Sequence, residues 1–197
     1  MKSDEKSIMI SGLGDLKKRY DEISSKTFDK VIFFMKKNPD LIARKNPNGT
    51  FGNLCEAIHG TRLSLEIDFR DNCLGDFMVE TILRILQNNR SVQTLILWMP
   101  FNKFSDQGVK QMFDEIRSMV SVKKLLVNFE WNFDLTARSL ENLCLVLRMM
   151  PNLEDVSVRM TKYTQVKENS EELFRNTLLD LKKLKRASYN NKFINIS

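Results

Sequence analysis

The sequence SVQTLILWM, from Ser91 to Met99, is followed thirty positions later by SVKKLLVNF, from Ser121 to Phe129. Alternate apolar residues in each stretch predict a β-strand with one buried face. The same alternation recurs once before and once after these stretches. The buried sets predicted in this way are Leu65, Ile67, Phe69; Leu95, Leu97, Met99; Leu125, Val127, Phe129; and Val156, Val158, Met160. Self-similarity at a fixed period of roughly 20–50 residues is typical of a solenoid, in which each unit packs against the next.

Each predicted strand is followed by a segment with helical spacing of apolar residues. Val109, Met112 and Phe113 mark one such helix, for which Ser105 is the expected N-cap, and Thr136 is the expected N-cap of the next helix. Alternating strands and helices predict an α/β fold with parallel strands on one face and helices on the other. We therefore expect Leu65, Leu95, Leu125 and Val156 to lie on neighbouring parallel strands of one sheet.

An asparagine follows each of the first three strands, at Asn72, Asn102 and Asn132. The pattern Val92-x-x-Leu95-x-Leu97-x-Met99-x-x-Asn102 resembles the leucine-rich repeat of the ribonuclease-inhibitor type. An extra Leu-x step in the strand is similar to the long-strand repeats of protist proteins. The resemblance implies a solenoid of about four to five units over residues 61–190, followed by a tail at 191–197. It also implies that the three asparagines form a structural ladder of hydrogen bonds to the backbone.

Residues 1–60 do not share the repeat, and we expect them to form an α-helical N-terminal cap over the exposed end of the array. Helical spacing is present from Leu13 to Ile23. Thr27 is the expected N-cap of a second helix over Phe28–Lys37, and a third short helix is expected over Asn53–Ile58.

Composition predicts a folded protein, because 42% of residues are hydrophobic and 28% are charged. The net charge of +6 comes from the ends of the chain, since the repeats are nearly neutral. Cys55, Cys73 and Cys144 lack metal-ligand spacing, and the N-terminus lacks the apolar segment of a signal peptide. We expect free buried thiols and an intracellular, reducing compartment, with the cytoplasm first and an organelle such as the mitochondrion left open. The sequence has no apolar run of about 18 residues, so no transmembrane segment is expected.

The sequence predicts no catalytic residue, no cofactor and no metal site. His59 is the single histidine and stands next to a turn without a nucleophile pattern. The Gly12-Leu13-Gly14 segment has neither the preceding strand nor the third glycine of a nucleotide-binding loop. We therefore do not expect an enzyme.

A binding surface is expected on the outward side of the strands, because Thr94, Ile96 and Trp98 alternate with the buried residues of their strand. Tryptophan is enriched at interface hot spots, and an apolar centre with a polar rim is typical of binding surfaces. Two alternatives for Trp98 stay open. In the first, the chain's own N- or C-terminal segment covers Trp98 or a bulge turns it inward; in the second, its exposure is due to chance. The predicted partner-binding residues are Ile96, Trp98, Leu126, Asn128, Glu130 and Arg159.

These features predict a non-catalytic protein–protein interaction scaffold or adaptor, a subunit of a larger intracellular assembly. The alternative is an accessory protein of a ribonucleoprotein that contacts RNA through its basic termini. The basic residues behind this alternative are Lys182, Lys183, Lys185, Arg186 and Lys192. No signal indicates a homo-oligomer.

Overall fold

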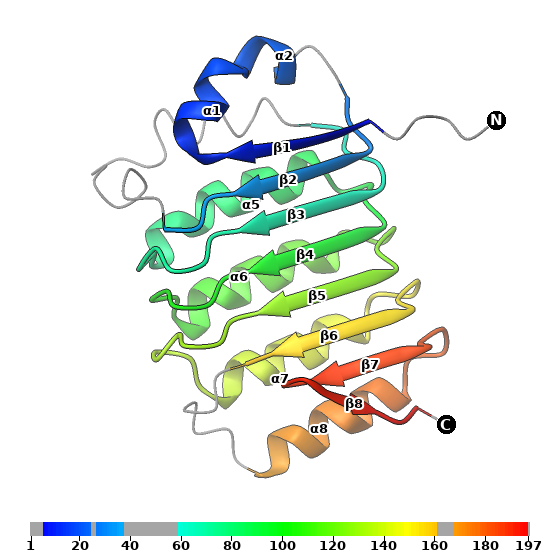
Figure 1. Cartoon of the computed structure of the whole chain (residues 1–197). Helices are drawn as coiled ribbons and strands as arrows, with labels where there is room; N and C mark the ends of the chain where they lie inside the picture. Colours follow the sequence, from blue (N-terminus) through cyan, green and yellow to red (C-terminus); the bar gives the residue numbers. More distant parts are fainter. Residues whose placement is uncertain (1–5, 25–26, 38–58, 161–167, 197) are drawn as a thin grey trace, which may run out of the picture.

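The fold is taken from a computed structural model, which describes residues 6–24, 27–37, 59–160 and 168–196. Within these residues, eight strands form one sheet in chain order. Neighbouring strands are parallel from β1 to β7, and β8 returns antiparallel to β7. Four helices, α5 to α8, lie along one face of this sheet, while α1 and α2 lie beside β1 (Figure 1).

The strands are short and nearly equal in length. They are β1 (Ser7–Ser11), β2 (Lys30–Phe34), β3 (Ser64–Asp68), β4 (Thr94–Trp98), β5 (Lys124–Asn128), β6 (Asp155–Arg159), β7 (Arg186–Tyr189) and β8 (Lys192–Ile194). The helices are α1 (Gly12–Lys18), α2 (Tyr20–Ser24), the 3-10 helix η1 (Asp76–Met78), α5 (Val79–Asn88), α6 (Asp106–Arg117), α7 (Ala137–Leu147) and α8 (Glu168–Leu179).

The strand register confirms the expected repeat. Leu65 pairs with Leu95, Leu95 with Leu125, and Leu125 with Val156, on four successive parallel strands. Parallel strands need a crossover connection, and helices α5 to α8 each lie in one of the connections between β3 and β7. The result is an α/β fold of repeated strand–helix units.

The core fills the space between the sheet and its helices. Phe129 meets the edges of two other fully buried rings, with centroids 6.3 Å from Phe104 and 5.8 Å from Phe113. Burial of one such side chain contributes about 1.5–3 kcal/mol. Because these rings come from neighbouring units, the core is continuous along the array rather than divided between units.

The helix starts are tied from one unit to the next by aspartates. Ser105 and Thr136 are confirmed as N-caps, because their side chains accept hydrogen bonds from backbone N–H groups of α6 and α7. Asp76 accepts from the backbone N–H and the hydroxyl of Ser105. Asp106 accepts in the same way from Thr136, at 2.9 and 2.5 Å, and also from the Ser139 hydroxyl at 2.5 Å. Burial acts to raise the pKa of Asp106, but the hydrogen bonds from Ser139 and Thr136 outweigh it and hold the pKa below its usual value.

The helix expected over Phe28–Lys37 is wrong, because this segment contains strand β2. Val31 and Phe33 are buried while Ile32 is half-buried and Phe34 exposed, which is the period of a strand. An apolar run this short fits either a helix or a strand, and pairing with β3 decides between them. The helical spacing from Leu13 to Ile23 is found as α1 and α2.

The N-terminal segment therefore extends the sheet by two strands instead of covering it with helices alone. Strands β1 and β2 belong to the same sheet as the repeats, and so does β8, which lies in the expected tail. The helix expected over Asn53–Ile58 lies outside the described residues. The division of the chain at residues 60 and 190 stays a prediction.

The outer edge of β1 is partly occupied by side chains from its own helix region. The backbone carbonyl of Met9 accepts a hydrogen bond of 3.0 Å from the Arg19 guanidinium. The backbone N–H of Ser11 donates to the Asp15 carboxylate at 3.0 Å. Arg19 and Asp15 thus satisfy backbone groups that an unpaired sheet edge would leave exposed.

Candidate protein-binding face

The sheet face opposite helices α5 to α8 carries the outward side chains in straight rows. The register pairs Ile96 with Leu126, so these two apolar side chains are neighbours on β4 and β5. It also pairs Trp98 with Asn128, and Asn128 with Arg159. We call this surface of strands β3 to β7 the strand face. Five of the six predicted partner-binding residues belong to its rows, and Glu130 lies just beyond the end of β5.

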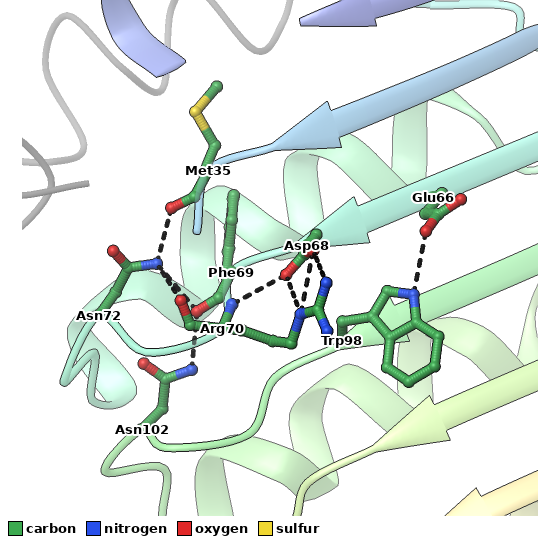
Figure 2. A network of polar contacts seen from close by, with 8 residues as sticks. All are labelled: Met35, Glu66, Asp68, Phe69, Arg70, Asn72, Trp98 and Asn102. Carbon is green, nitrogen blue, oxygen red and sulfur yellow. Dashed lines mark hydrogen bonds and ion pairs between the residues drawn. The ribbon is translucent and has the colours of Figure 1, made fainter. Parts of the chain in front are cut away.

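Trp98 is half-buried and is held by polar groups of its own protein. Its indole N–H donates to the Glu66 carboxylate at 3.0 Å. The guanidinium carbons of Arg70 and Arg159 lie 5.3 and 5.6 Å from the centre of its ring, within the range of cation–π attraction. Figure 2 shows the indole directed at Glu66, with Arg70 beside it.

Arg70 is fixed in turn by Asp68. Its guanidinium donates to both carboxylate oxygens, with a shortest distance of 2.6 Å, and Asp68 is itself buried. The hydrogen bonds that the Arg70 guanidinium donates to the Asp68 carboxylate raise the pKa of Arg70 above its usual value, so this guanidinium keeps its charge. The side chains of Glu66, Asp68, Arg70 and Arg159 therefore hold the Trp98 ring in place.

The other predicted partner-binding residues differ in what they can offer. Leu126 and Ile96 are half-buried and present apolar surface. Asn128 is only 3% exposed. It exchanges hydrogen bonds with Glu130, whose backbone N–H donates to its amide oxygen at 2.9 Å and whose carboxylate accepts from its amide at 3.2 Å. Asn128 therefore supports the strand end and offers little surface to a partner.

The three ladder asparagines are buried at the ends of their strands. The amide of Asn102 donates to the carbonyls of Phe69 and Met99 at 2.9 and 3.0 Å, and its oxygen accepts from the Leu74 N–H at 2.9 Å. Asn132 repeats these contacts one unit later, and Asn72 donates back to Met35 (Figure 2). Each asparagine therefore joins its own unit to the previous one.

A fourth asparagine was not found from the sequence. The side-chain oxygen of Asn190 accepts from the backbone N–H of Met160 at 2.9 Å. The ladder pattern gave no signal for it, because Asn190 follows the end of β7 directly, whereas Asn72, Asn102 and Asn132 each lie four residues after the end of their strand.

An aromatic cluster at the ends of the strands also escaped the sequence analysis. Phe101 and Trp131 stack with their ring centroids 5.4 Å apart and their planes within 6°, and Phe133 meets Trp131 edge-on at 6.3 Å. Both stacked residues have left-handed backbone angles, with φ of 57° and 62°. The sequence contains a signal for this cluster, because Phe101 directly precedes Asn102 and Trp131 directly precedes Asn132, at the same position of two units. Trp131 packs in this turn and remains 36% exposed.

Among the described residues, Cys73, Cys144 and His59 belong to no common metal-binding group. Cys144 is buried, and burial raises the pKa of its thiol. Cys73 is exposed, so the expectation of a buried thiol is wrong there, because the left-handed turn at this residue directs it outward. Cys55 lies outside the described residues. His59 is exposed, and the described residues contain no group of three or more His, Cys, Asp or Glu that could hold a metal ion.

Several basic residues of the C-terminal cluster have partners on the preceding unit. Lys185 pairs with Glu154 at 2.6 Å, and Arg186 pairs with Asp155 at 2.8 Å. Lys183 donates to the side-chain oxygen of Asn152 at 2.7 Å. In the part of the chain that the structure describes, no helix has the length and apolar character needed to span a bilayer.

Comparison with known proteins gives matches among solved structures. No family model and no curated protein matches the chain. Among solved structures, the C-terminal domain of tropomodulin from Caenorhabditis elegans is similar in fold, with a TM-score of 0.47 and 9% identity over 90% of this chain and 84% of that one. The strand register and the asparagine contacts are themselves consistent with a leucine-rich-repeat-like α/β fold.

Proposed function

We propose that this protein is a non-catalytic interaction scaffold or adaptor, a subunit of a larger intracellular assembly that binds a partner protein through the strand face. The observation that carries the proposal is the half-buried Trp98, held in place by Glu66, Arg70 and Arg159 beside the apolar pair Ile96 and Leu126. We assign the fold to the ribonuclease-inhibitor type of leucine-rich-repeat solenoid, in which the N-terminal strands and helices close the first end.

Preorganisation supports this proposal. A flexible side chain at an interface loses about 0.5–1.5 kcal/mol of conformational freedom on binding. Trp98 has already lost that freedom, because Glu66 and two guanidinium groups fix its ring. Binding energy from its apolar surface is then available to the complex. A tryptophan in such a setting is typical of an interface hot spot.

The test replaces the apolar centre of the strand face by carboxylates. The double variant Trp98→Glu with Leu126→Glu is expected to lose its partner in pull-down experiments from the native source, followed by mass spectrometry. The fold is expected to survive, because the new carboxylate at position 98 would stand near Arg70 and Arg159. Thermal unfolding followed by circular dichroism checks this point.

The matched control carries the same charge change on the helix side. Leu145 and Leu179 are 60% and 56% exposed on α7 and α8, so Leu145→Glu with Leu179→Glu should retain the partner. Retention of the same partner by both double variants would contradict binding through the strand face.

We do not propose the ribonucleoprotein alternative. It rests on the basic C-terminal cluster, and there Glu154 and Asp155 of the preceding unit neutralise Lys185 and Arg186.

A further inference from the structure

A hollow of about 390 Å³ opens on the strand face where β5, β6 and β7 meet the β8 return. Three cationic side chains line it, namely Lys124, Arg159 and Arg186, together with a single carboxylate, Asp155. We call it the β5–β8 hollow. Its place beside Leu126 makes it continuous with the proposed partner-binding surface.

The charges in the β5–β8 hollow do not cancel. Asp155 is shared by two cations, since one of its oxygens lies 2.8 Å from Arg186 and 3.7 Å from Lys124. One carboxylate balances one of these two charges. Arg159 forms no ion pair with any described residue, and its buried Nε–H has no hydrogen-bond acceptor. The hollow therefore holds an excess of about two positive charges. One of these is the Arg159 guanidinium, which has no carboxylate partner among the described residues.

An unbalanced guanidinium on a surface of this kind favours a carboxylate ligand. Arginine presents a planar fork of N–H donors that matches two carboxylate oxygens. The ring of Trp98 lies 5.6 Å from the guanidinium carbon and orients this fork. Cation–π contact limits the freedom that Arg159 would lose on binding.

The walls of the β5–β8 hollow suit a polypeptide rather than a simple polyanion. Leu126 is half-buried on one side, and Phe193 is 89% exposed on the other. The hydroxyls of Ser188 and Ser157, which also line the hollow, are joined by a hydrogen bond of 2.9 Å. Because Asp155 inside the hollow and Glu66 further along the same face repel negative charge, a segment whose carboxylates are separated by apolar residues fits better than a continuous chain of phosphates.

We infer that the β5–β8 hollow binds an acidic, extended segment of the partner protein. A carboxylate of that segment would bind Arg159, and an apolar side chain beside it would pack against Leu126 and Phe193. This inference rests on the proposed function, because it names the chemistry of the partner at the same face.

The direct test uses synthetic probes with the whole 197-residue chain. The first probe is a fluorescein-labelled peptide with leucine between glutamates, Glu-Glu-Leu-Glu-Glu. The second has lysine in place of glutamate, and the third is an oligouridylate of the same length. Fluorescence anisotropy is expected to show saturable binding of the acidic peptide alone. Stronger binding of the basic peptide or of the oligouridylate, or no saturable binding of the acidic peptide, would overturn the inference.

Two variants of the hollow locate the binding site. Arg159→Gln removes the unpaired charge, and Lys124→Glu with Arg186→Glu reverses two others. Each is expected to weaken binding of the acidic peptide about tenfold or more, since each removes charge-assisted hydrogen bonds or ion pairs to the peptide. The matched control, Lys110→Glu with Arg117→Glu on α6, changes the net charge equally on the helix side and should leave affinity unchanged. Equal losses in the control and in the hollow would show a general charge effect and overturn the inference.

The native partner separates this inference from the proposed function. If Trp98→Glu with Leu126→Glu loses the partner while Lys124→Glu with Arg186→Glu retains it, the strand face binds the partner but the acidic preference is wrong. If both double variants retain the partner, the proposed function itself fails. Loss in both, with the α6 control unaffected, is the result we expect.

Discussion

At the scale of single residues, the asparagine ladder shows how a buried polar side chain can hold a repeat together. Asn102 contacts the backbone of two units, at the Phe69 and Met99 carbonyls and the Leu74 N–H. These backbone groups lie where a strand has ended and the next helix has not begun. The amide supplies the partners that neither element provides.

Replacement of Asn102 should therefore be costly. Asn102→Ala leaves two carbonyls and one N–H without this partner, and each unsatisfied buried group costs about 1–3 kcal/mol. We expect the free energy of unfolding to fall by about 3 kcal/mol or more, measured by urea denaturation. The exposed Gln111→Ala on α6 serves as control and should stay within about 0.5 kcal/mol of the unchanged protein. A loss below about 1 kcal/mol for Asn102→Ala would contradict the ladder's role.

The environment of Trp98 illustrates where sequence reasoning stops at this scale. Alternation along β4 was enough to direct Trp98 outward. The partners of its ring come from other strands, because Arg159 reaches it across Asn128 and Arg70 folds back after β3. Such neighbours depend on side-chain conformations that periodicity does not encode. The same holds for Asn128, which alternation directs outward but which its neighbours bury.

At the scale of elements, the helix starts are coupled through Asp76 and Asp106, each of which binds the N-cap residue of the next helix. The tight approach of η1 to α6 leaves room for only a glycine at position 108. A Cβ added to Gly108 would lie 2.2 Å from an Asp76 carboxylate oxygen and 3.1 Å from a Val79 methyl. The Asp76 side chain cannot move freely, because Ser105 donates two hydrogen bonds to it.

A double-mutant cycle tests this coupling. Gly108→Ala alone should lower the free energy of unfolding by about 1 kcal/mol, although alanine is the better helix former by about the same amount. In the Asp76→Ala background the clash with the carboxylate is absent. There Gly108→Ala should be neutral or stabilising, so the two changes would not be additive. Additive effects, measured by thermal and urea unfolding of all four proteins, would contradict the contact.

Apart from α1 and α2, the elements predicted correctly have a repeated signal. Strands β3 to β6 and their helices each had a neighbour with the same spacing, so a weak pattern was read several times. The run at Lys30–Phe34 had no such support, because the interval from Val31 to Leu65 is longer than the intervals between the other strands. Strand β8 carries only three residues and gave no periodicity at all.

At the scale of the whole molecule, the two ends of the sheet differ. Strand β1 has its outer edge occupied in part by Arg19 and Asp15. Strand β8 is the edge strand at the other end, where it pairs antiparallel with β7 and is only three residues long. Unpaired edges are sites at which sheets of different molecules join, and both ends carry a feature that opposes this.

Removal of the edge contacts should promote self-association. Arg19→Ala with Asp15→Ala exposes the Met9 carbonyl and the Ser11 N–H, which can then pair with a second chain. Sedimentation velocity should show more concentration-dependent oligomer than for the unchanged chain. The control, Lys110→Ala with Asp114→Ala, removes an exposed ion pair of 2.5 Å on α6 and should change nothing. Identical sedimentation of the two double variants would contradict a protective role for these side chains.

The pairings between β3, β4, β5 and β6 are so similar that nothing in them limits the number of strands in the sheet. The number of strands is limited instead at the two ends of the sheet, by the partly occupied edge of β1 and by the antiparallel strand β8. Copying one interior unit would widen the surface offered to a partner and leave the neighbouring contacts as they are. The width of the strand face can therefore change by one strand–helix unit at a time, through gain or loss of a segment, while the two ends of the sheet stay the same.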